Sequence, residues 1–359
     1  MGKNIACQLL RMSLPTIVEN LAAENALPSG KLPAAFLHRL LAQYVSSQAN
    51  VELGAGVGRD AAVIPYSDRL LIAKTDPITF VTENIGHYVV QVNANDIACM
   101  GGEPKWFMAT LLFPEHKTED AQVEEIFRQI SRACATHAIA WCGGHTEITA
   151  TVTQPLVIGM MFGEAPLSRR YAPARIEPGD HILLTKGLAV EATAIIGKHK
   201  AAALAEIFAT DFASHCQNFL FEPGISVLAA AKLAWEVAGI HALHDPTEGG
   251  LANAVHELLE EKQLGAEIYG AQVLLLPETK LLCEHFALDP LGLIASGALL
   301  VVGQAGACEE LLQKYHAANI PAAMIGRVLD AGEERWLLED NEKQVLPRFS
   351  RDEILRVLD

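Results

Sequence analysis

Two successive series of alternating strand and helix patterns restrict the fold of this sequence more than any other feature. In the first series, short apolar runs alternate with apolar positions at helical spacing. They predict strands at 61–64, 70–74, 106–113, 139–142 and 156–162, and helices at 34–44, 84–100 and from Thr118 onwards. Because strands that alternate with helices are typical of α/β proteins, we expect an α/β (α+β) fold.

The second series begins at residue 181, after a stretch at 168–180 that contains two prolines and ends in Pro-Gly-Asp, a turn signal. It predicts strands at 181–185, 241–244, 266–269, 297–302, 323–328 and 335–338, and helices at 191–196, 201–209, 225–238, 249–263 and around Leu281 and Leu311. A chain of 359 residues exceeds what one hydrophobic core usually organises. We therefore predict domains at 30–167 and 168–345, with a helical extension at 1–29 and a helix or tail at 346–359.

The composition excludes several classes of function. A formal charge of −16 disfavours binding to nucleic acid, because a phosphate backbone is met by clustered lysine and arginine. No apolar stretch approaches the roughly 20 residues of a membrane span, and the first residues lack the pattern of a signal peptide. The seven cysteines are scattered, which is typical of reduced thiols. We expect a cytoplasmic protein with no nucleic-acid or membrane partner.

The stretch VELGAGVGRDAAVI, residues 51–64, has three glycines at alternate positions, followed by Arg59 and Asp60. It is not a dinucleotide fingerprint, which needs GxGxxG between a strand and a helix, nor a P-loop, which needs Gly-Lys-Ser/Thr. A plain glycine-rich turn with a solvated aspartate is one interpretation. A site built around Asp60 is the other.

Two further carboxylates stand at informative places. Asp76 follows an apolar strand, and ligands in α/β sheets bind at the carboxyl ends of strands. Asp96, beside Asn95, falls in the last turn of the predicted helix, where the helix dipole disfavours a negative charge by about 0.3–1 kcal/mol. A cation would remove that cost. Asp-Pro as an ordinary strand end and Asp96 as an exposed residue are the alternatives.

Two glycine pairs are accompanied by polar residues. In His244-Asp-Pro-Thr-Glu-Gly-Gly, Asp245 and Glu248 fit a capping box, but two glycines in a first helical turn cost about 1 kcal/mol each. Close approach of another backbone or of a phosphate would explain them. In Cys142-Gly-Gly-His-Thr-Glu, the glycines can form a bare turn. A zinc site is poorly supported there, because no second His or Cys stands at ligand spacing.

The order of the motifs GRDAAVI, KTDPITF, NANDIACMGGEP, GGHTEI and HDPTEGGL resembles that of the aminoimidazole-ribonucleotide synthetase (PurM-like) superfamily. The strings GKLP, NDIA with G-x-E-P, GGHTE, PGD, LDPL and SGALL are most similar to its HypE-like group, whose members serve hydrogenase maturation. The likeness extends from Gly30 to about Val328.

The resemblance implies a two-domain subunit whose N-terminal strands form a barrel across a homodimer interface, with ATP and Mg²⁺ as cofactors. It implies Mg²⁺ ligands at Asp60, Asp76 and Asp96. It implies nucleotide contacts at Gly58, Arg59, Asn95, Gly143, Gly144, Thr146, Glu147, Asp245, Thr247, Gly249 and Gly250. Lys74, His145 and Lys186 are candidates for contact with the γ-phosphate or for proton transfer, although lone lysines at strand ends can equally be surface residues.

Two departures from the family pattern are visible. Arg59 stands where several relatives carry a second carboxylate, so it either contacts phosphate or weakens a metal site. HypE proper ends in a cysteine that accepts a carbamoyl group, whereas this sequence ends in Arg-Val-Leu-Asp and its last cysteine is Cys308. We therefore do not expect the thiocarbamate dehydration of HypE proper.

The leading hypothesis is an ATP- and Mg²⁺-dependent enzyme that phosphorylates a carbonyl, amide or phosphate oxygen of an acceptor, either a small molecule or a group derived from a protein thiol. One alternative is an ATP-binding scaffold dimer that serves a maturation-protein partner with little turnover. Another is a small-molecule kinase related to thiamine-monophosphate kinase. The sequence does not name the acceptor.

Overall fold

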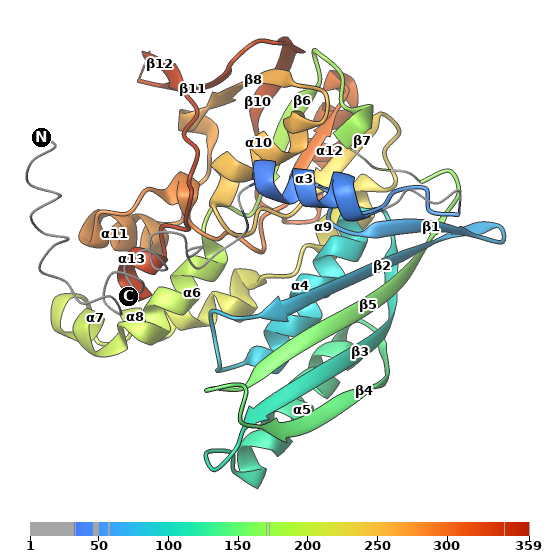
Figure 1. The fold of residues 1–359 in the computed structure, drawn as a ribbon. Coiled ribbons are helices and arrows are strands. Elements are labelled where there is room, and N and C mark those ends of the chain that lie inside the picture. Colours follow the sequence, from blue (N-terminus) through green and yellow to red (C-terminus); the bar gives the residue numbers. More distant parts are fainter. Residues whose placement is uncertain are drawn as a thin grey trace, which may run out of the picture.

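The computed structural model describes residues 32, 34–45, 50–56, 58–169, 171, 173–340 and 342–358. Within them, two β-sheets lie side by side, each with helices packed against it (Figure 1). The helix predicted within residues 1–29 lies outside the described residues. The helix predicted at 34–44 is confirmed as α3, Ala34–Tyr44.

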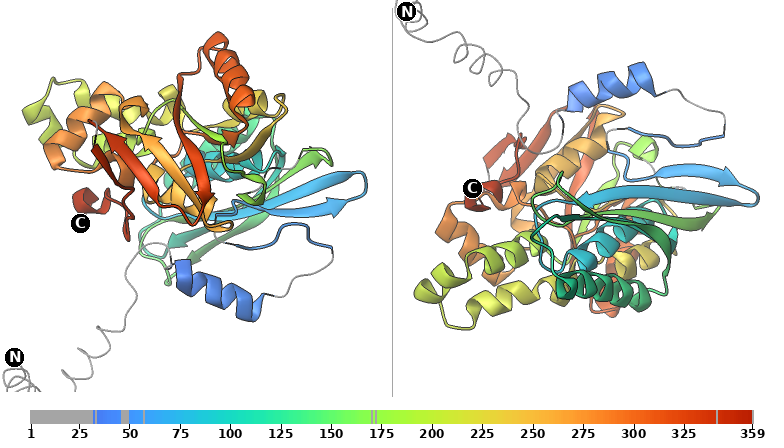
Figure 2. Two further views of the ribbon diagram at one scale, coloured as in Figure 1. Left: turned by 90° about the horizontal axis from the view of Figure 1, so that it is seen from above. Right: turned by 60° about the horizontal axis from the view of Figure 1, so that its bottom comes forward.

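The first sheet has five strands in the order β1-β2-β5-β3-β4. β3 and β4 are parallel, and the other neighbours are antiparallel. Two helices, α4 (Ile85–Cys99) and α5 (Asp120–Thr136), cover one face. Among the described residues, the only helix on the side of the other face is α3, and β3, β4 and β5 remain open there (Figure 2). The strands are β1 Ala62–Tyr66, β2 Arg69–Ile78, β3 Glu103–Pro114, β4 Ala140–Thr149 and β5 Leu156–Pro166.

The alternation of side chains along β3 separates the two faces of this sheet. Phe107 and Leu111 are buried against the helices, whereas Trp106 and Met108 point to the open face and are exposed. Successive side chains of a strand point to opposite faces of the sheet. A strand in a sheet that is covered on one face should therefore alternate between buried and exposed side chains. The open face nevertheless carries large apolar side chains.

The second sheet has seven strands in the order β12-β11-β8-β10-β6-β9-β7, with only β8 and β11 parallel. The strands are β6 His181–Thr185, β7 Ile240–His244, β8 Leu264–Tyr269, β9 Leu300–Gly303, β10 Ala322–Ala331, β11 Arg335–Glu339 and β12 Glu342–Val345. The helices of this half are α6 Val190–His199, α7 Ala201–Ile207, α8 Phe212–Asn218, α9 Leu228–Ala234, α10 Gly250–Glu260, α11 Pro277–Phe286, α12 Ala305–Ala317 and α13 Leu355–Leu358.

Helix α4 joins the two halves. It packs against α5 and three strands of the first sheet, and it also contacts α9 and β7 of the second half. Every residue from Ile85 to Cys99 except His87 is buried, including the polar residues Gln91, Asn93, Asn95 and Asp96. The core around α4 continues through α9 to Tyr315 of α12. Polar side chains on a helix buried all round must have specific partners, and they mark the site.

Two predicted elements differ in the structure. The helix predicted at 225–238 is shorter, α9 at Leu228–Ala234, because the carbonyls of residues 224–226 bind side chains of other elements and do not enter a helix. The glycines of the GGHTE motif form no turn, since they lie inside strand β4. In the described part of the chain, no helix combines the length and apolarity that crossing a bilayer requires.

Candidate functional site

The end of strand β2 and the last turn of α4 bring one lysine and two aspartates together. Lys74 and Asp76 lie on the face of β2 that is covered by α4. The ammonium of Lys74 lies 3.2 Å from Oδ2 of Asp96 and 3.5 Å from Oδ2 of Asp76. Asp96 is in the last turn of α4, as predicted, and it is 4 % exposed. The cation beside it is Lys74, which offsets the unfavourable helix dipole.

Asp60 reaches the same region from the loop before β1. Its Oδ1 lies 2.7 Å from Nδ1 of His244, at the end of β7. The other ring nitrogen of His244 lies 3.6 Å from Glu257 of α10. Burial lowers the pKa of the His244 imidazole, but the charges and hydrogen bonds of Asp60 and Glu257 outweigh burial and raise it well above its usual value. His244 is therefore a cation that fixes the orientation of Asp60.

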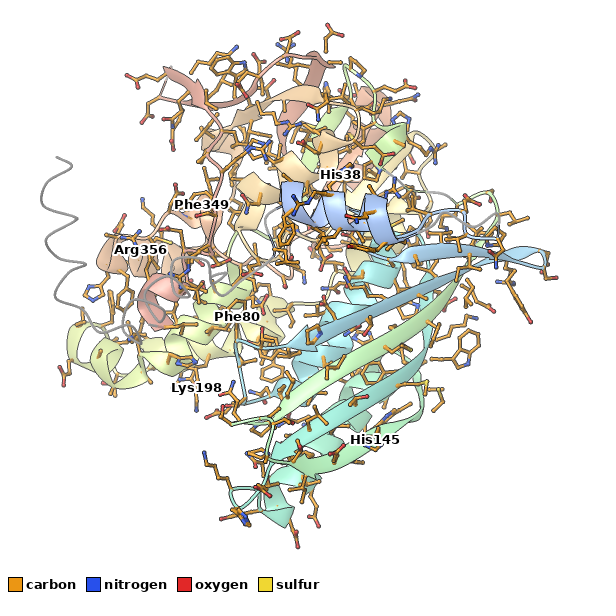
Figure 3. All side chains as sticks on the ribbon, viewed as in Figure 1. His38, Phe80, His145, Lys198, Phe349 and Arg356 are labelled. Carbon is orange, nitrogen blue, oxygen red and sulfur yellow. The ribbon has the colours of Figure 1, made fainter. Side chains whose placement is uncertain are left out.

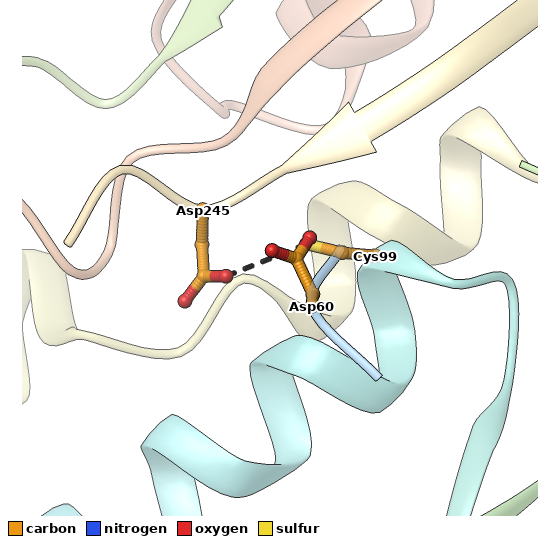
Figure 4. A group of neighbouring side chains, drawn as sticks. All are labelled: Asp60, Cys99 and Asp245. Atoms are coloured by element: carbon orange, nitrogen blue, oxygen red, sulfur yellow. Dashed lines mark hydrogen bonds between the residues drawn. The ribbon is translucent and has the colours of Figure 1, made fainter. Parts of the chain in front are cut away.

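Asp245 and Cys99 complete the group (Figure 4). The Cys99 thiol donates to Oδ1 of Asp245 over 3.7 Å. Asp60, Cys99 and Asp245 each present a ligand atom within 4.8 Å of the others, a spacing that suits one metal ion. Oδ2 of Asp245 is buried without a hydrogen-bond partner. A buried carboxylate oxygen with no partner is costly, and a cation would remove that cost.

The cluster holds more carboxylates than cations, and this excess controls its protonation. Burial lowers the pKa of Lys74, but the charges of Asp96, Asp76 and Asp60 raise it well above its usual value. Burial and the charge of Asp60 raise the pKa of Asp245 to about 7, against the opposing charges of His244 and Lys74. The cluster therefore retains protons that a bound divalent cation would displace.

The Gly249-Gly250 pair begins α10, and the predicted capping box with Asp245 as the N-cap is wrong. The helix starts at Gly250 with Gly249 as its N-cap, and Asp245 is not the cap. Both glycines have positive φ, +82° and +63°, and a Cβ on Gly250 would lie 2.5 Å from the carbonyl oxygen of Leu291. The approach of another backbone therefore explains these glycines. The amide of Gly249 donates to Asp352 over 2.7 Å.

Asn95 and Lys186 hold one segment of backbone between them. The Asn95 amide donates to the carbonyl of Ile225 over 2.8 Å and accepts from the amide of Val227 over 2.9 Å. The Lys186 ammonium donates to the carbonyls of Gly224 and Ser226 over 2.9 and 2.7 Å. Burial lowers the pKa of Lys186 to about 8. Both side chains are therefore occupied by residues 224–227, which we call the loop before α9.

Arg59 and Gly58 lie where the first half meets α10. The Arg59 guanidinium lies 3.4 Å from Oε1 of Glu261 and 3.4 Å from the carbonyl of Gly54, so in this structure it contacts a carboxylate. Gly58 has a φ of +73°, and a Cβ there would lie 2.5 Å from the carbonyl oxygen of Glu257. The glycine thus allows Asp60 to approach His244. Thr247 is half-buried in the turn before α10.

The GGHTE motif lies apart from the cluster, on edge strand β4 (Figure 3). Gly144, Ala109, Gly159 and Asp76 form one row across four neighbouring strands, so Gly144 and Asp76 are about 14 Å apart by strand spacing. His145 and Glu147 pair with Thr110 and Leu112, on the open face of the sheet. His145 is 65 % exposed and its Nε2 lies 3.2 Å from Glu147. Gly143 and Thr146 are exposed too.

A second buried carboxylate, Glu191 at the start of α6, lies behind the cluster. Burial raises its pKa to about 7, and the charges of Asp352 and Asp245 add to the shift while hydrogen bonds from Ser296 oppose it. Its Oε2 has no hydrogen-bond partner. The buried acidic region thus extends from β2 to the C-terminal segment that carries Asp352.

The predicted residues thus fall into four groups. Lys74, Asp60, Asp76, Asp96 and Asp245 meet in the cluster, and Asn95 and Lys186 bind the loop before α9. The residues of the GGHTE motif lie on edge strand β4, with His145 and Glu147 on its open face. Gly58, Arg59, Thr247, Gly249 and Gly250 lie near the start of α10 or against it. Cys99, Glu257, Glu191 and Asp352 were not predicted. Cys99 and His244 lie inside motifs that were identified, but no spacing rule signalled their partners.

This chain is similar in sequence to known proteins. Residues 58–165 match the family described as AIR synthase related protein, N-terminal domain, and residues 177–338 match its C-terminal domain. Carbamoyl dehydratase HypE of Rhodobacter capsulatus is 30% identical over 262 residues, which cover 71% of this chain and 70% of the relative.

Two solved structures have a similar fold. Hydrogenase maturation protein HypE in complex with ATP has a TM-score of 0.69 at 20% identity, covering 91% of this chain and 98% of that one. Thiamine monophosphate kinase from Aquifex aeolicus has a TM-score of 0.65 at 19% identity, covering 86% and 97%. At these identities the likeness establishes the fold.

Proposed function

Because this chain belongs to the AIR synthase related family and to its HypE-like group, we propose that it is an ATP- and Mg²⁺-dependent phosphoryl-transfer enzyme. In this reaction, a carbonyl, amide or phosphate oxygen of an acceptor attacks the γ-phosphorus of ATP. The bond from that phosphorus to the β,γ-bridging oxygen breaks, and ADP leaves. The acceptor oxygen becomes a phosphate ester or anhydride, which is a better leaving group.

The observation that carries the proposal is the cluster of Asp60, Asp76, Asp96 and Asp245 around Lys74, in which Asp96 and Asp245 are buried and the Asp76 side chain is 36% exposed. Phosphoryl transfer depends mainly on positioning and on neutralising the charge of the phosphates. An acidic protein can supply that charge with a lysine and with cations held by carboxylates. The cluster has both parts, and it lies where β2, α4 and β7 meet.

Mg²⁺ fits the oxygen donors of this cluster. It prefers carboxylate oxygens and waters, and it usually bridges one or two carboxylates to substrate phosphates. Asp60 and Asp245 would hold it, since their ligand atoms are adjacent and Oδ2 of Asp245 has no hydrogen-bond partner. Bound there, Mg²⁺ would neutralise phosphate charge. Lys74 would hold Asp76 and Asp96 in place, and His244 would orient Asp60.

We also propose that the active form is a homodimer joined through the open face of the first sheet. Met108 of β3 and Met160 of β5 are direct cross-strand partners on that face, and they are 36% and 42% exposed. Large apolar side chains on an uncovered sheet face mark an interaction surface. His145 and Glu147 lie on the same face, so a second subunit would cover the motif that this subunit leaves exposed.

Calorimetry with a non-hydrolysable ATP analogue and Mg²⁺ tests the nucleotide site. We expect micromolar to millimolar binding that Asp76→Ala weakens and that Lys105→Ala, at a half-buried pair with Glu164, leaves unchanged. Mn²⁺ and Zn²⁺ serve as comparison ions, because Cys99 adds a sulfur donor. Absence of binding at millimolar analogue would exclude the proposal.

Light scattering tests the dimer. Met160→Glu places a charge in the centre of the open face and should convert a dimer to a monomer. Thr118→Glu, a change outside the first sheet, is the control and should leave the mass unchanged. A monomeric wild-type protein at tens of micromolar would contradict the dimer.

A second candidate function is an ATP-binding scaffold for a maturation-protein partner. The contact of Lys74 with Asp76 and Asp96 favours it, because a resident ammonium already fills part of the space between carboxylates that a catalytic cation would use. ADP formation in a panel of acceptors decides between the two. Acceleration by one acceptor, thiamine monophosphate among them, would exclude the scaffold. ATP binding without turnover across the panel would favour it.

A further inference from the structure

A crevice between α4, α5 and the loop before α9 is separate from the carboxylate cluster. Its volume is about 420 Å³, at the lower end of the range for small-molecule pockets. His87 and Gln91 line it from α4, and Arg128, Arg132 and His137 line it from α5 and the residue that follows. Ser226 belongs to its third wall. We call this the α4–α5 crevice.

The charge of the crevice is opposite to that of the protein. The whole chain has a formal charge of −16, yet the only carboxylate among the described residues that line the crevice is Glu125. Glu125 pairs with Arg128. No carboxylate of the described residues pairs with Arg132, so one guanidinium is available to a ligand.

Within the described part of the chain, no carboxylate forms an ion pair with either histidine of the crevice. Burial lowers the pKa of His87 to about 4, and the charge of His137 adds to this effect, whereas a hydrogen bond with the backbone of Leu220 opposes it. Burial and the charge of Lys232 lower the pKa of His137. Nε2 of His137 lies 3.0 Å from Oε1 of Gln91. An anion bound in the crevice would oppose these effects and favour the protonated form of both rings.

The third wall of the crevice is the loop before α9, which Asn95 and Lys186 hold through hydrogen bonds. Gly224, Ile225 and Ser226 line the crevice, and their carbonyls accept from Lys186 and Asn95 on the other side. Asn95 immediately precedes Asp96, which contacts Lys74 over 3.2 Å. A ligand that fixes this wall would therefore act on the loop before α9, which is hydrogen-bonded to Asn95. Asn95 is the neighbour in sequence of Asp96, a member of the carboxylate cluster.

We propose that the α4–α5 crevice is a binding site for a small anionic metabolite that carries phosphate or carboxylate groups, and that its occupancy changes the affinity of the carboxylate cluster for nucleotide. The guanidinium of Arg132 pairs with the anion. One ring nitrogen of each histidine is already bonded, that of His137 to Gln91 and that of His87 to the backbone of Leu220, so the anion favours protonation of the second ring nitrogen, which then donates to it. The loop before α9 connects the two sites. The proposal does not depend on the reaction that the cluster performs.

The binding test uses the full-length protein with ¹³C-labelled histidine rings. Inorganic phosphate and succinate are titrated separately at constant pH and ionic strength, which distinguishes the two kinds of anion. The signals of His87 and His137, assigned through His87→Gln and His137→Gln, should shift with saturation in the millimolar range for one of them. Arg132→Ala should weaken this response about tenfold or more, because it removes a charge-assisted hydrogen bond.

Two controls keep the result specific. Arg348→Ala removes an exposed guanidinium of the other half and should not change the response. Asp60→Asn alters the cluster and should leave the crevice response intact, even if the proposed function is wrong. Equal responses in wild type and Arg132→Ala, or shifts that never saturate, would overturn the site.

The coupling is measured as the affinity for the ATP analogue with and without the saturating anion. We expect a change of about fivefold or more, in the range typical of coupled sites. Arg132→Ala should abolish the change while the affinity without anion stays the same. An affinity that is identical with and without the anion in the wild type would overturn the coupling.

Discussion

The buried carboxylate cluster and strand β4 both carry polar motifs of the first sheet, but they differ in environment. Asp76 and Gly144 stand in the same cross-strand row. Yet Lys74 and Asp76 face α4, whereas His145 and Glu147 face away from it and are mostly exposed. The difference is which face of the sheet the helices cover.

This difference teaches how to interpret polar motifs in a single chain. In the cluster, burial strengthens the interactions between charges. The charges of Asp96, Asp76 and Asp60 therefore raise the pKa of Lys74, and burial together with the charge of Asp60 raises the pKa of Asp245. On β4, water screens the His145 and Glu147 side chains, and such pairs contribute little. The contacts of the cluster side chains described above all lie within one subunit. His145 and Glu147 of β4 would gain further contacts only if another molecule covered the open face of the sheet.

Removing the central cation should have the largest effect. Lys74→Met leaves Asp96, which is 4 % exposed, without its cation, and breaking a buried pair from one side costs about 3–5 kcal/mol. Asp76, whose side chain is 36% exposed, adds little to this cost. Urea unfolding should therefore show a large loss in the free energy of unfolding. The double variant Lys74→Met/Asp96→Asn should recover part of it. A single variant as stable as the wild type would mean that the cluster is open to water.

Glu191 extends the buried region and should make stability depend on pH. An unfolded glutamate ionises near pH 4.3, whereas Glu191 in the fold has a pKa of about 7. Between these values the folded state holds a proton that the unfolded state lacks, so the free energy of unfolding falls as the pH rises.

The loss from Glu191 should total roughly 2–4 kcal/mol between pH 4 and 7 and stop above pH 7. Glu191→Gln keeps the shape of the side chain but cannot ionise, so its profile should lack this contribution. Chemical denaturation at several pH values measures both profiles. Profiles of equal slope would contradict the buried environment of Glu191.

Asp60→Asn tests the cluster as a cation site. It keeps the size of the side chain but weakens both the contact with His244 and the charge beside Asp245. We expect the affinity for Mg²⁺ with nucleotide to fall about 10- to 100-fold, the range found for groups that support metal sites. Calorimetry measures it, with Asp68→Asn at an exposed turn as the control. Equal affinities would place the cation elsewhere.

His145→Ala should have the smallest effect on stability. An exposed side chain away from caps and cores usually changes the free energy of unfolding by less than about 0.5 kcal/mol. Urea unfolding of the monomeric Met160→Glu background measures this. If turnover falls in the His145→Ala dimer while stability does not, β4 functions only across an interface. If His145→Ala lost as much stability as Lys74→Met, the exposed strand β4 and the carboxylate cluster would not differ in their contribution to stability.

Much of the fold could be predicted from the sequence, since strand and helix periodicities are local. Helices α3, α4 and α10 and the strands around Lys74 and Leu183 appear close to their predicted bounds. The helix predicted at 225–238 was too long, because Asn95 and Lys186 lie far from residues 224–227 in the chain and their hydrogen bonds are invisible to a local pattern.

The site was predictable only in part for the same reason. The type and position of Asp60, Asp76 and Asp96 drew attention to them, and the motif order identified their family. Cys99, Glu257 and Glu191 gave no such signal, because a buried thiol or carboxylate differs from an ordinary one only through its neighbours.

The sequence by itself determined the family, the alternating pattern of elements and the aspartates that the chain brings to β2 and α4. Only the tertiary structure decided that Lys74 lies between two of these aspartates, that Arg59 contacts Glu261, and that Asn95 binds a loop. Periodicity depends on neighbours three or four residues apart, whereas charge pairing depends on residues brought together by packing. The stretch GAGVGRD illustrates this, because Gly58 lets Asp60 reach His244, 184 residues away.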